Sequence, residues 1–458
     1  MQDRTAVSTA FRMKRRHFIK AAAAGSVLAG LPAVSLARSV SANEKVNLAC
    51  IGIGNQGGGI ARTIGRSDLV NVVALCDVDL EHSRTNAVKE AFSGADQFQD
   101  FRKMFDQMGD QIDAVTIGTP DHSHFPIGML AMSMGKHIYV EKPMANTFQE
   151  SELMMAAEKK YKVAAQVGNQ GHSGGNYHQF KAWKEAGVIK DVTKIVAFMN
   201  SPRRWHGWTV DGYPTGEEKP DTLDWDLWHT TSAESVPFSG RLHPGNWRSW
   251  YRFGNGAFGD WGPHILDTAH RFLELGLPTE IQAIKRDGPN AYIFPQASTI
   301  KFTFPARGDM PPVEVFWYDG TANKPEAPPE LEGRSLQAQG KLIFGKDLTF
   351  YGGTHGAILR IVPESKLREI HADLPEFEVG SSHHQNFILG AKGEEQTRSS
   401  LDVAGLLSQV FNLGTIAQEL GGTLKFDPAT KRFTNNDQAN ELLAGPPPRK
   451  GWEDYYKL

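Results

Sequence analysis

The chain has 458 residues, of which 40% are hydrophobic and 22% are charged, and its formal net charge is -3. This balance offers no basic surface, which excludes nucleic acid and an anionic membrane surface as expected partners. The length exceeds what one hydrophobic core normally serves, so we expect two domains behind a leader.

Residues 1–42 have the pattern of an export signal. Arg15 and Arg16 stand in a charged stretch that precedes an alanine-rich apolar run and the small residues 40–42. This order predicts a twin-arginine signal peptide, and the apolar run of ~16 residues is too short for a stable membrane anchor. We therefore expect the twin-arginine translocase to export the folded chain to a periplasmic or other extracytoplasmic space. Folding before export agrees with the scarcity of cysteine, since only Cys50 and Cys76 occur.

The next segment predicts a dinucleotide-binding βαβ unit. An apolar strand at 46–53 leads into a glycine-rich turn and a helix, and a second strand at 70–76 ends in Asp77. The carboxylate of Asp77 can accept hydrogen bonds from ribose hydroxyls, and its neighbours Val78 and Asp79 bring no cation for a 2'-phosphate, so NAD is favoured over NADP. The alternative is that Asp77 is only a turn residue. The residues of the predicted phosphate loop are Gly52, Gly54, Asn55, Gln56 and Gly57.

Alternating helices and strands continue to residue 167. We expect helices at 79–92, 101–108 and 125–135 and strands at 113–117, 137–140 and 163–167. Thr147 and Glu150 form a capping box for a helix that ends at Tyr161. Because the strands are apolar without alternation, the pattern predicts an α/β domain with a doubly wound parallel sheet, the Rossmann fold, over residues 43–167.

The strand at 137–140 runs directly into Glu141, Lys142 and Pro143. A cation is thereby placed at the carboxyl end of a buried strand, where open α/β sheets bind ligands. The alternative is a surface lysine before a turn proline.

With these motifs the chain resembles the Gfo/Idh/MocA oxidoreductases, named for glucose-fructose oxidoreductase and inositol dehydrogenase. The resemblance implies that Lys142 lies near the nicotinamide ring and the reacting hydroxyl, as a catalytic residue. It also implies a second α+β domain at 168–458 with an open, mainly antiparallel sheet, a final helix and tail docked on the first domain, and a homo-oligomer. The residues that carry it are Gly52, Gly54, Gly57, Asp77, Thr119, Pro120, His124, Glu141, Lys142 and Pro143. Of these, Asp77, Thr119, Pro120, His124, Glu141 and Lys142 are expected at the cofactor along with the phosphate loop.

A helix predicted at 259–275 carries the remaining catalytic candidates. Asp260, His264, Asp267 and Arg271 share one face, and Pro263 is expected in the first turn, which would place Asp260 at the helix start. The resemblance implies that the Asp260 and His264 pair faces Lys142. His264 would then take the hydroxyl proton, Asp260 would hold the imidazole, and Lys142 would stabilise the developing negative charge. The alternative is a capping aspartate and a core histidine.

Residues 201–261 hold seven of the ten tryptophans. Aromatic faces with polar handles suit sugar rings, although a packing layer or subunit interface explains most of them as well. The candidate substrate residues are Asp267, His172, Trp205, His206, Arg248 and Trp261. No metal is expected, because His355, His383 and His384 have no carboxylate or cysteine at ligand spacing.

We therefore expect an exported NAD-dependent oxidoreductase that acts on a secondary hydroxyl of a sugar, polyol or glycoside. Outside the cytoplasm no nicotinamide pool is replenished, so the cofactor is expected to be tightly bound and recycled in place. Two alternatives stay open. One is a redox-neutral NAD-dependent glycosidase or lyase, with an extra base for which His206, His243 and Tyr251 are candidates. The other is a noncatalytic carbohydrate-binding protein on a dehydrogenase scaffold.

Overall fold

The computed structural model describes residues 44–201, 208–232 and 235–458. The predicted signal peptide, Trp205 and His206 lie outside the described residues, and their expected roles stay predictions. Within the described ranges, no helix has the length and apolar character that crossing a membrane requires.

The first part of the chain forms a six-stranded sheet in which every pair of neighbours is parallel. Its strands, in spatial order, are β3 (Asp96–Phe98), β2 (Val70–Cys76), β1 (Val46–Ile51), β4 (Ala114–Ile117), β5 (His137–Val140) and β6 (Ala165–Val167). Helices cover both faces. They are α2 (Asn55–Gly65), α3 (Asn86–Ala91), α4 (Phe101–Met108), α5 (Asp121–Ser133) and α6 (Phe148–Tyr161). The predicted capping box at α6 is present.

Alternate residues of β1 point into two different cores, which is why the sheet needs helices on both sides. Ala49 and Ile51 pack with α4, α5 and α6, whereas Leu48 and Cys50 pack with α2 and the later helix α11 (His383–Ala391). The doubly wound arrangement follows from this two-sided apolar pattern.

The second sheet has nine strands and is antiparallel except for the parallel pair β7 and β10. Its strands, in spatial order, are β13 (Arg360–Val362), β12 (Thr349–Gly352), β11 (Gln339–Phe344), β7 (Lys194–Met199), β10 (Val313–Asp319), β9 (Ala297–Phe304), β8 (Glu280–Asp287), β14 (Thr423–Asp427) and β15 (Arg432–Phe433). The predicted fold class, a parallel Rossmann sheet followed by an open, mainly antiparallel sheet, is confirmed.

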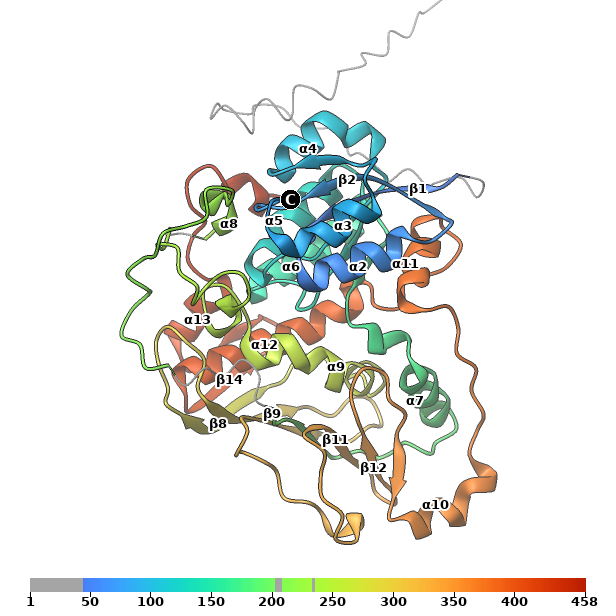
Figure 1. The fold of residues 1–458 in the computed structure, drawn as a ribbon. Helices are drawn as coiled ribbons and strands as arrows, with labels where there is room; N and C mark the ends of the chain where they lie inside the picture. Colours follow the sequence, from blue (N-terminus) through green and yellow to red (C-terminus); the bar gives the residue numbers. More distant parts are fainter. Residues whose placement is uncertain (1–43, 202–207, 233–234) are drawn as a thin grey trace, which may run out of the picture.

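Two long helices, α9 (Gly256–Phe272) and α12 (Leu401–Leu420), lie between the two sheets (Figure 1). Two glycines of α12 allow close packing against its neighbouring helices. A Cβ at Gly405 would meet Met155 of α6, and a Cβ at Gly414 would meet Phe258 of α9. The tail packs on the first sheet's helices, where the Tyr456 hydroxyl donates to Glu150 over 2.7 Å. The other helices are α7 (Gly175–Glu185), α8 (Trp225–His229), α10 (Glu364–Ile370) and α13 (Asp437–Ala444).

Two of the helix predictions were wrong. Residues 79–92 form a turn, a 3-10 helix at Ser83–Thr85 and only then α3. Helix α9 begins at Gly256, so Pro263 lies inside it and Asp260 lies one turn after its start. The reason is tertiary: the whole first turn of α9 is buried, so packing keeps it helical on the N-terminal side of the proline.

Candidate active site

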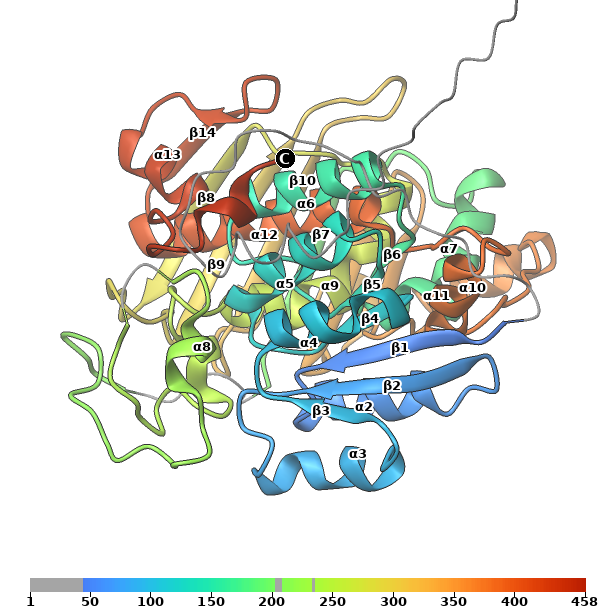
Figure 2. The same ribbon diagram turned by 90° about the horizontal axis from the view of Figure 1, so that it is seen from above.

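A pocket opens at the carboxyl ends of β1, β2 and β4, with about 960 Å³ of empty space when the open solvent at its mouth is included. One wall is the Rossmann domain and the other is the segment around α8, which Figure 2 shows beside the ends toward which β1 and β2 point. The lining residues from the first wall include Gly52, Gly54, Asn55, Gln56, Asp77, Asp79, His82, Arg84, Thr119 and Pro120, and those from the second include Trp228, Thr230, His243, Trp247 and Arg248.

The phosphate loop fits a pyrophosphate because its glycines bring backbone, and no side chains, to the pocket. Gly52 has φ +76°, and a Cβ on it would lie 2.6 Å from Thr119. A Cβ on Gly57 would lie 1.9 Å from the Gly52 carbonyl oxygen. No side chain caps the N-terminus of α2 at Gly54, so its first amides and its dipole are left for an anion. The residues present therefore fit a nicotinamide dinucleotide.

Thr119 and Pro120 line this pocket, but His124 does not. The His124 ring is 1% exposed and lies between the carbonyl oxygens of Thr119 and Pro143, each 2.8 Å away. Burial lowers the pKa of His124 to about 4. The neutral ring has one N–H and donates to one of these two carbonyls, and in these contacts His124 packs beneath the loop rather than touching a cofactor.

Lys142 is held by Asp260. Its ammonium donates to Asp260 Oδ1 over 2.8 Å and to the Asp260 carbonyl over 2.9 Å, and both side chains are buried. Arg248, which lies on the pocket wall, has its Nε 3.7 Å from the same carboxylate oxygen. The Lys142–Asp260 pair therefore adjoins the dinucleotide pocket through Arg248. The expected pairing of Asp260 Oδ1 with the His264 imidazole is replaced by this bond to Lys142.

Asn255, the residue before α9, fixes that helix against the first domain. Its amide donates to Asp121 Oδ2 over 3.0 Å, and its side-chain amide donates to Asn146 Oδ1 over 3.1 Å. Asn412 of α12 donates to the Asn255 oxygen over 2.9 Å. These bonds fix the start of α9 against the first domain, close to the Lys142–Asp260 contact.

His264 lies one turn further along α9, with a buried Nδ1 that has no hydrogen-bond partner among the described residues. The ring of His355 stacks on it at 3.9 Å between centroids, and Trp261 lies edge-on to both rings. Burial, then the charge of Lys142, lowers the pKa of His264 well below its usual 6.5. The ring is therefore neutral, and a neutral imidazole is able to accept a proton.

Asp267, three residues after His264 on α9, lies beside His172. Arg271 donates to His172 Nε2 over 2.9 Å, which leaves the proton on Nδ1, 3.6 Å from Asp267 Oδ2. Both side chains are almost fully buried. Two of the predicted substrate residues are thus neighbours in the structure.

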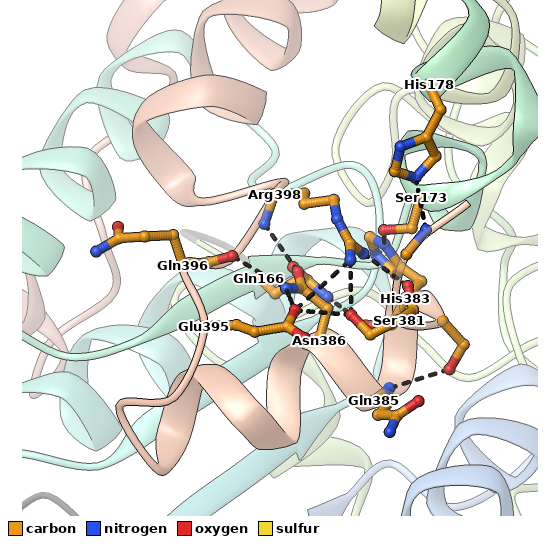
Figure 3. A network of polar contacts seen from close by, with 12 residues as sticks. Gln166, Ser173, His178, Ser381, His383, Gln385, Asn386, Glu395, Gln396 and Arg398 are labelled. Carbon is orange, nitrogen blue, oxygen red and sulfur yellow. Dashed lines mark hydrogen bonds and ion pairs between the residues drawn. The ribbon is translucent and has the colours of Figure 1, made fainter. Parts of the chain in front are cut away.

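The loop that carries His172 is anchored by a polar network (Figure 3). Ser173 lies 2.9 Å from His383 Nδ1, and His383 Nε2 donates to Val167 over 2.8 Å. Arg398 donates to the carbonyl and hydroxyl of Ser381. Because both ring nitrogens of His383 are used, this histidine is structural, and the described residues contain no group of three or more His, Cys, Asp or Glu suited to a metal.

Glu141, the residue before Lys142, is a buried carboxyl group with a raised pKa. It is 5% exposed, and a Cβ on Gly168 would lie 2.2 Å from its Oε1. Burial raises the pKa of Glu141 to about 7, against the opposing charges of Lys142 and Arg248. Neither Glu141 nor Lys142 belongs to the lining of the dinucleotide pocket.

This raised pKa predicts a dependence of stability on pH. A carboxyl whose folded pKa exceeds its unfolded value stabilises the fold below the unfolded pKa and loses that contribution as pH rises through the folded pKa. We expect the free energy of unfolding to fall between pH 4.5 and 7, with roughly 3 kcal/mol of that fall due to Glu141. In E141Q that part of the fall should disappear, as measured by urea unfolding at pH 5 and pH 8. An identical pH dependence in E141Q would contradict the assignment.

Most tryptophans of the segment 208–254 form a packing layer. Trp225 stacks on Trp228 at 4.3 Å, and Trp247 and Trp250 are buried in the same cluster. This layer docks on the first domain, where the Asp224 amide donates to the Val78 carbonyl over 2.9 Å. The segment therefore builds the outer wall of the dinucleotide pocket.

Several residues of this site were not predicted. Arg84 and His82 lie on the pocket wall after β2, and His355 lies 91 positions after the histidine that it stacks on. Arg84 and His82 follow a turn that the sequence predicted as helix. No spacing pattern links His355 to His264.

A Rossmann domain with a phosphate loop, joined to a mainly antiparallel domain that holds a lysine–aspartate pair, defines a two-domain dinucleotide-binding protein. Two family models match the chain: the oxidoreductase family NAD-binding Rossmann fold over residues 46–169, and the oxidoreductase family C-terminal alpha/beta domain over residues 336–454. The protein belongs to the Gfo/Idh/MocA oxidoreductase family.

Curated relatives match only part of the chain. The glycosyl hydrolase family 109 protein of Shewanella pealeana is 28% identical over 181 residues, which cover 34% of this chain and 40% of the relative. The alpha-N-acetylgalactosaminidase of Shewanella oneidensis is 28% identical over 185 residues, which cover 34% of this chain and 39% of the relative. The match thus spans about two fifths of these relatives.

Solved structures share the fold. The WlbA dehydrogenase from Bordetella pertussis, in complex with NADH and UDP-GlcNAcA, superposes with a TM-score of 0.56 at 16% identity, over 84% of this chain and 99% of that one. At this identity the likeness shows the fold alone.

Proposed function

We propose that the protein uses tightly bound NAD to oxidise a secondary hydroxyl of a sugar, polyol or glycoside. The observation that carries the proposal is the buried Lys142–Asp260 pair beside the dinucleotide pocket, with the unpartnered Nδ1 of His264 one turn further along α9. A buried cation and a neutral imidazole on neighbouring elements are what alcohol oxidation requires.

Each side chain has one task. Lys142 stabilises the negative charge that develops on the substrate oxygen, and His264 accepts the hydroxyl proton. Asp260 positions the ammonium through its 2.8 Å bond. Bound NAD would accept the hydride from the carbinol carbon. Asp267, His172 and Trp261 are proposed to contact the rest of the sugar.

If the leader exports the protein, the protein must retain its cofactor. In that case no cellular pool reoxidises NADH, so a dissociable cofactor would support a single turnover. We therefore propose export by the twin-arginine translocase, assembly as a homo-oligomer, and recycling of the bound cofactor by a second substrate or by a later step of the same reaction.

The second candidate is a redox-neutral glycosidase, which the names of the Shewanella relatives favour. Oxidation at a ring carbon would acidify the adjacent C–H. Loss of that proton and of the glycosidic oxygen forms an enone, and addition of water and return of the hydride restore the sugar. Of the bases expected for this proton, His243 lies beside Asp79 on the pocket wall and Tyr251 packs on Phe294.

Offering free sugars and aryl glycosides to the purified protein separates the two candidates. Oxidoreductase action predicts an oxidised sugar and reduced bound cofactor, detected at the NADH absorbance. Glycosidase action predicts release of the phenol with no net NADH. The absence of both with a broad panel of sugars and glycosides would contradict the proposed function.

A further inference from the structure

The tail of the chain is fixed to the Rossmann domain on both sides of Arg449. Before this residue, a Cβ on Gly445 would lie 3.0 Å from the side chain of Thr147, the residue that caps α6. After it, the buried ring of Trp452 packs on Phe101 of α4 at 6.2 Å between ring centroids. Phe101 itself lines the dinucleotide pocket. The backbone at residue 449 is therefore held against the Rossmann wall of that pocket.

From this position Arg449 reaches the opposite wall. Its guanidinium donates to the Asp226 carboxylate over 2.5 Å and to the Asp226 carbonyl over 2.8 Å. Its Nε donates to the Thr230 carbonyl over 2.5 Å, and its backbone amide donates to the Thr231 carbonyl over 3.2 Å. One residue of the tail thus holds α8 near its start and again just after its end.

Thr230, the residue after α8, lines the pocket in a strained conformation. It is 3% exposed, and its backbone has φ +45° and ψ -114°. A β-branched residue rarely adopts a positive φ, because its Cβ crowds the backbone, and such strain persists only where surrounding contacts hold it. The bonds that Arg449 makes to the carbonyls of Thr230 and Thr231 are contacts of this kind. Loss of the Arg449 side chain should therefore let this turn relax.

We propose that Arg449 is a positioning residue for the bound dinucleotide, because it holds the Thr230 turn and with it the outer wall of the pocket, and so makes NAD leave slowly. This wall contributes Leu227, Trp228 and Thr230 to the pocket lining, so its displacement would uncover the ligand. The ion pair with Asp226 is the lesser part of the contact, since the Asp226 side chain is 79% exposed and exposed ion pairs contribute little.

The inference rests on the proposed function, since it presumes that the pocket holds NAD tightly. The full-length protein is loaded with radiolabelled NAD and freed of excess by gel filtration. Unlabelled NAD is then added, and the label that stays bound is measured over time. In R449A we expect NAD to dissociate about 10 to 100 times faster, as the loss of a charge-assisted hydrogen bond from the wall would give.

A double-mutant cycle tests the route through Thr230. Glycine adopts a positive φ without strain, so a T230G turn depends less on Arg449. In the T230G background R449A should accelerate dissociation by less than about threefold. A general loss of stability caused by R449A would act equally in both backgrounds, so the cycle separates positioning from a merely structural role.

Lys450 gives the matched control, because it is the next residue, has the same charge, and has an exposed side chain outside the pocket lining. K450A should keep the wild-type dissociation rate. D226N leaves the bonds from Arg449 to backbone carbonyls in place and should stay within about threefold of that rate.

Wild-type dissociation in R449A, equal acceleration by R449A in the wild-type and T230G backgrounds, or release from D226N as fast as from R449A would each overturn the inference while the proposed function stood. A wild-type protein that loses its labelled NAD during the gel filtration would overturn both.

Discussion

Replacing Lys142 by methionine is expected to lower kcat by about 10²–10³-fold while the protein still binds NAD. The ammonium is the buried cation beside the dinucleotide pocket that can stabilise charge on the substrate oxygen, and Lys142 is not part of the phosphate loop or the pocket lining. The measurement compares turnover of the sugar substrate with dinucleotide released on denaturation, using wild type and K142M.

K142M also removes one of the cations beside the buried Asp260 carboxylate and leaves Arg248 Nε, 3.7 Å away, opposite it, which can destabilise the fold by up to about 3–5 kcal/mol. The double variant K142M/D260N removes both charges and should recover much of the stability but none of the activity. Wild-type turnover in either variant would refute the role of Lys142.

Replacing His264 by glutamine is expected to lower kcat by about 10²–10⁴-fold, because the amide cannot accept the hydroxyl proton. The lowered pKa of His264 has a second consequence. A general base must be deprotonated to act. The wild-type enzyme should therefore begin to lose activity on acidification only well below pH 6.5. The residual activity of H264Q should lack this acid limb. The pH dependence of kcat/KM for both proteins is the measurement.

His355 supplies the control for that experiment, since its ring stacks on His264 at 3.9 Å but is solvent-exposed. H355Q should retain most of the turnover and the acid limb of the wild type. If H355Q lost activity as completely as H264Q, or if H264Q kept wild-type turnover, His264 would not be the proton acceptor.

The fold was predictable because its signals are local and repeated. The strand Val70–Cys76 and the helix Phe101–Met108 have the bounds that the sequence pattern predicts, and the capping box fixes the start of α6. Burial on both faces of a parallel sheet leaves long apolar runs, which a sequence displays directly.

The contacts within the site were less predictable because they join distant segments. Pro263 suggested a helix start at Asp260, but burial of the preceding turn keeps that turn helical. The sequence shows Asp77 and Asp79 as similar carboxylates, and only the folded turn determines which one the backbone amides occupy.

The pH at which His264 titrates could not be predicted from the sequence either. Its low pKa depends on burial, on Lys142 and on His355, and these groups come from three separate parts of the chain. Tertiary packing sets the desolvation, which residue types at helical spacing do not specify.

The most direct test of the account is the dinucleotide content of the protein purified from the cytoplasm. After extensive gel filtration the protein is denatured, and the supernatant is analysed by chromatography for NAD and NADP. A tightly retained cofactor predicts close to one NAD per chain, in wild type and in K142M alike. Finding no dinucleotide in the wild type, even after saturation with NAD before the filtration, would contradict a retained and internally recycled cofactor.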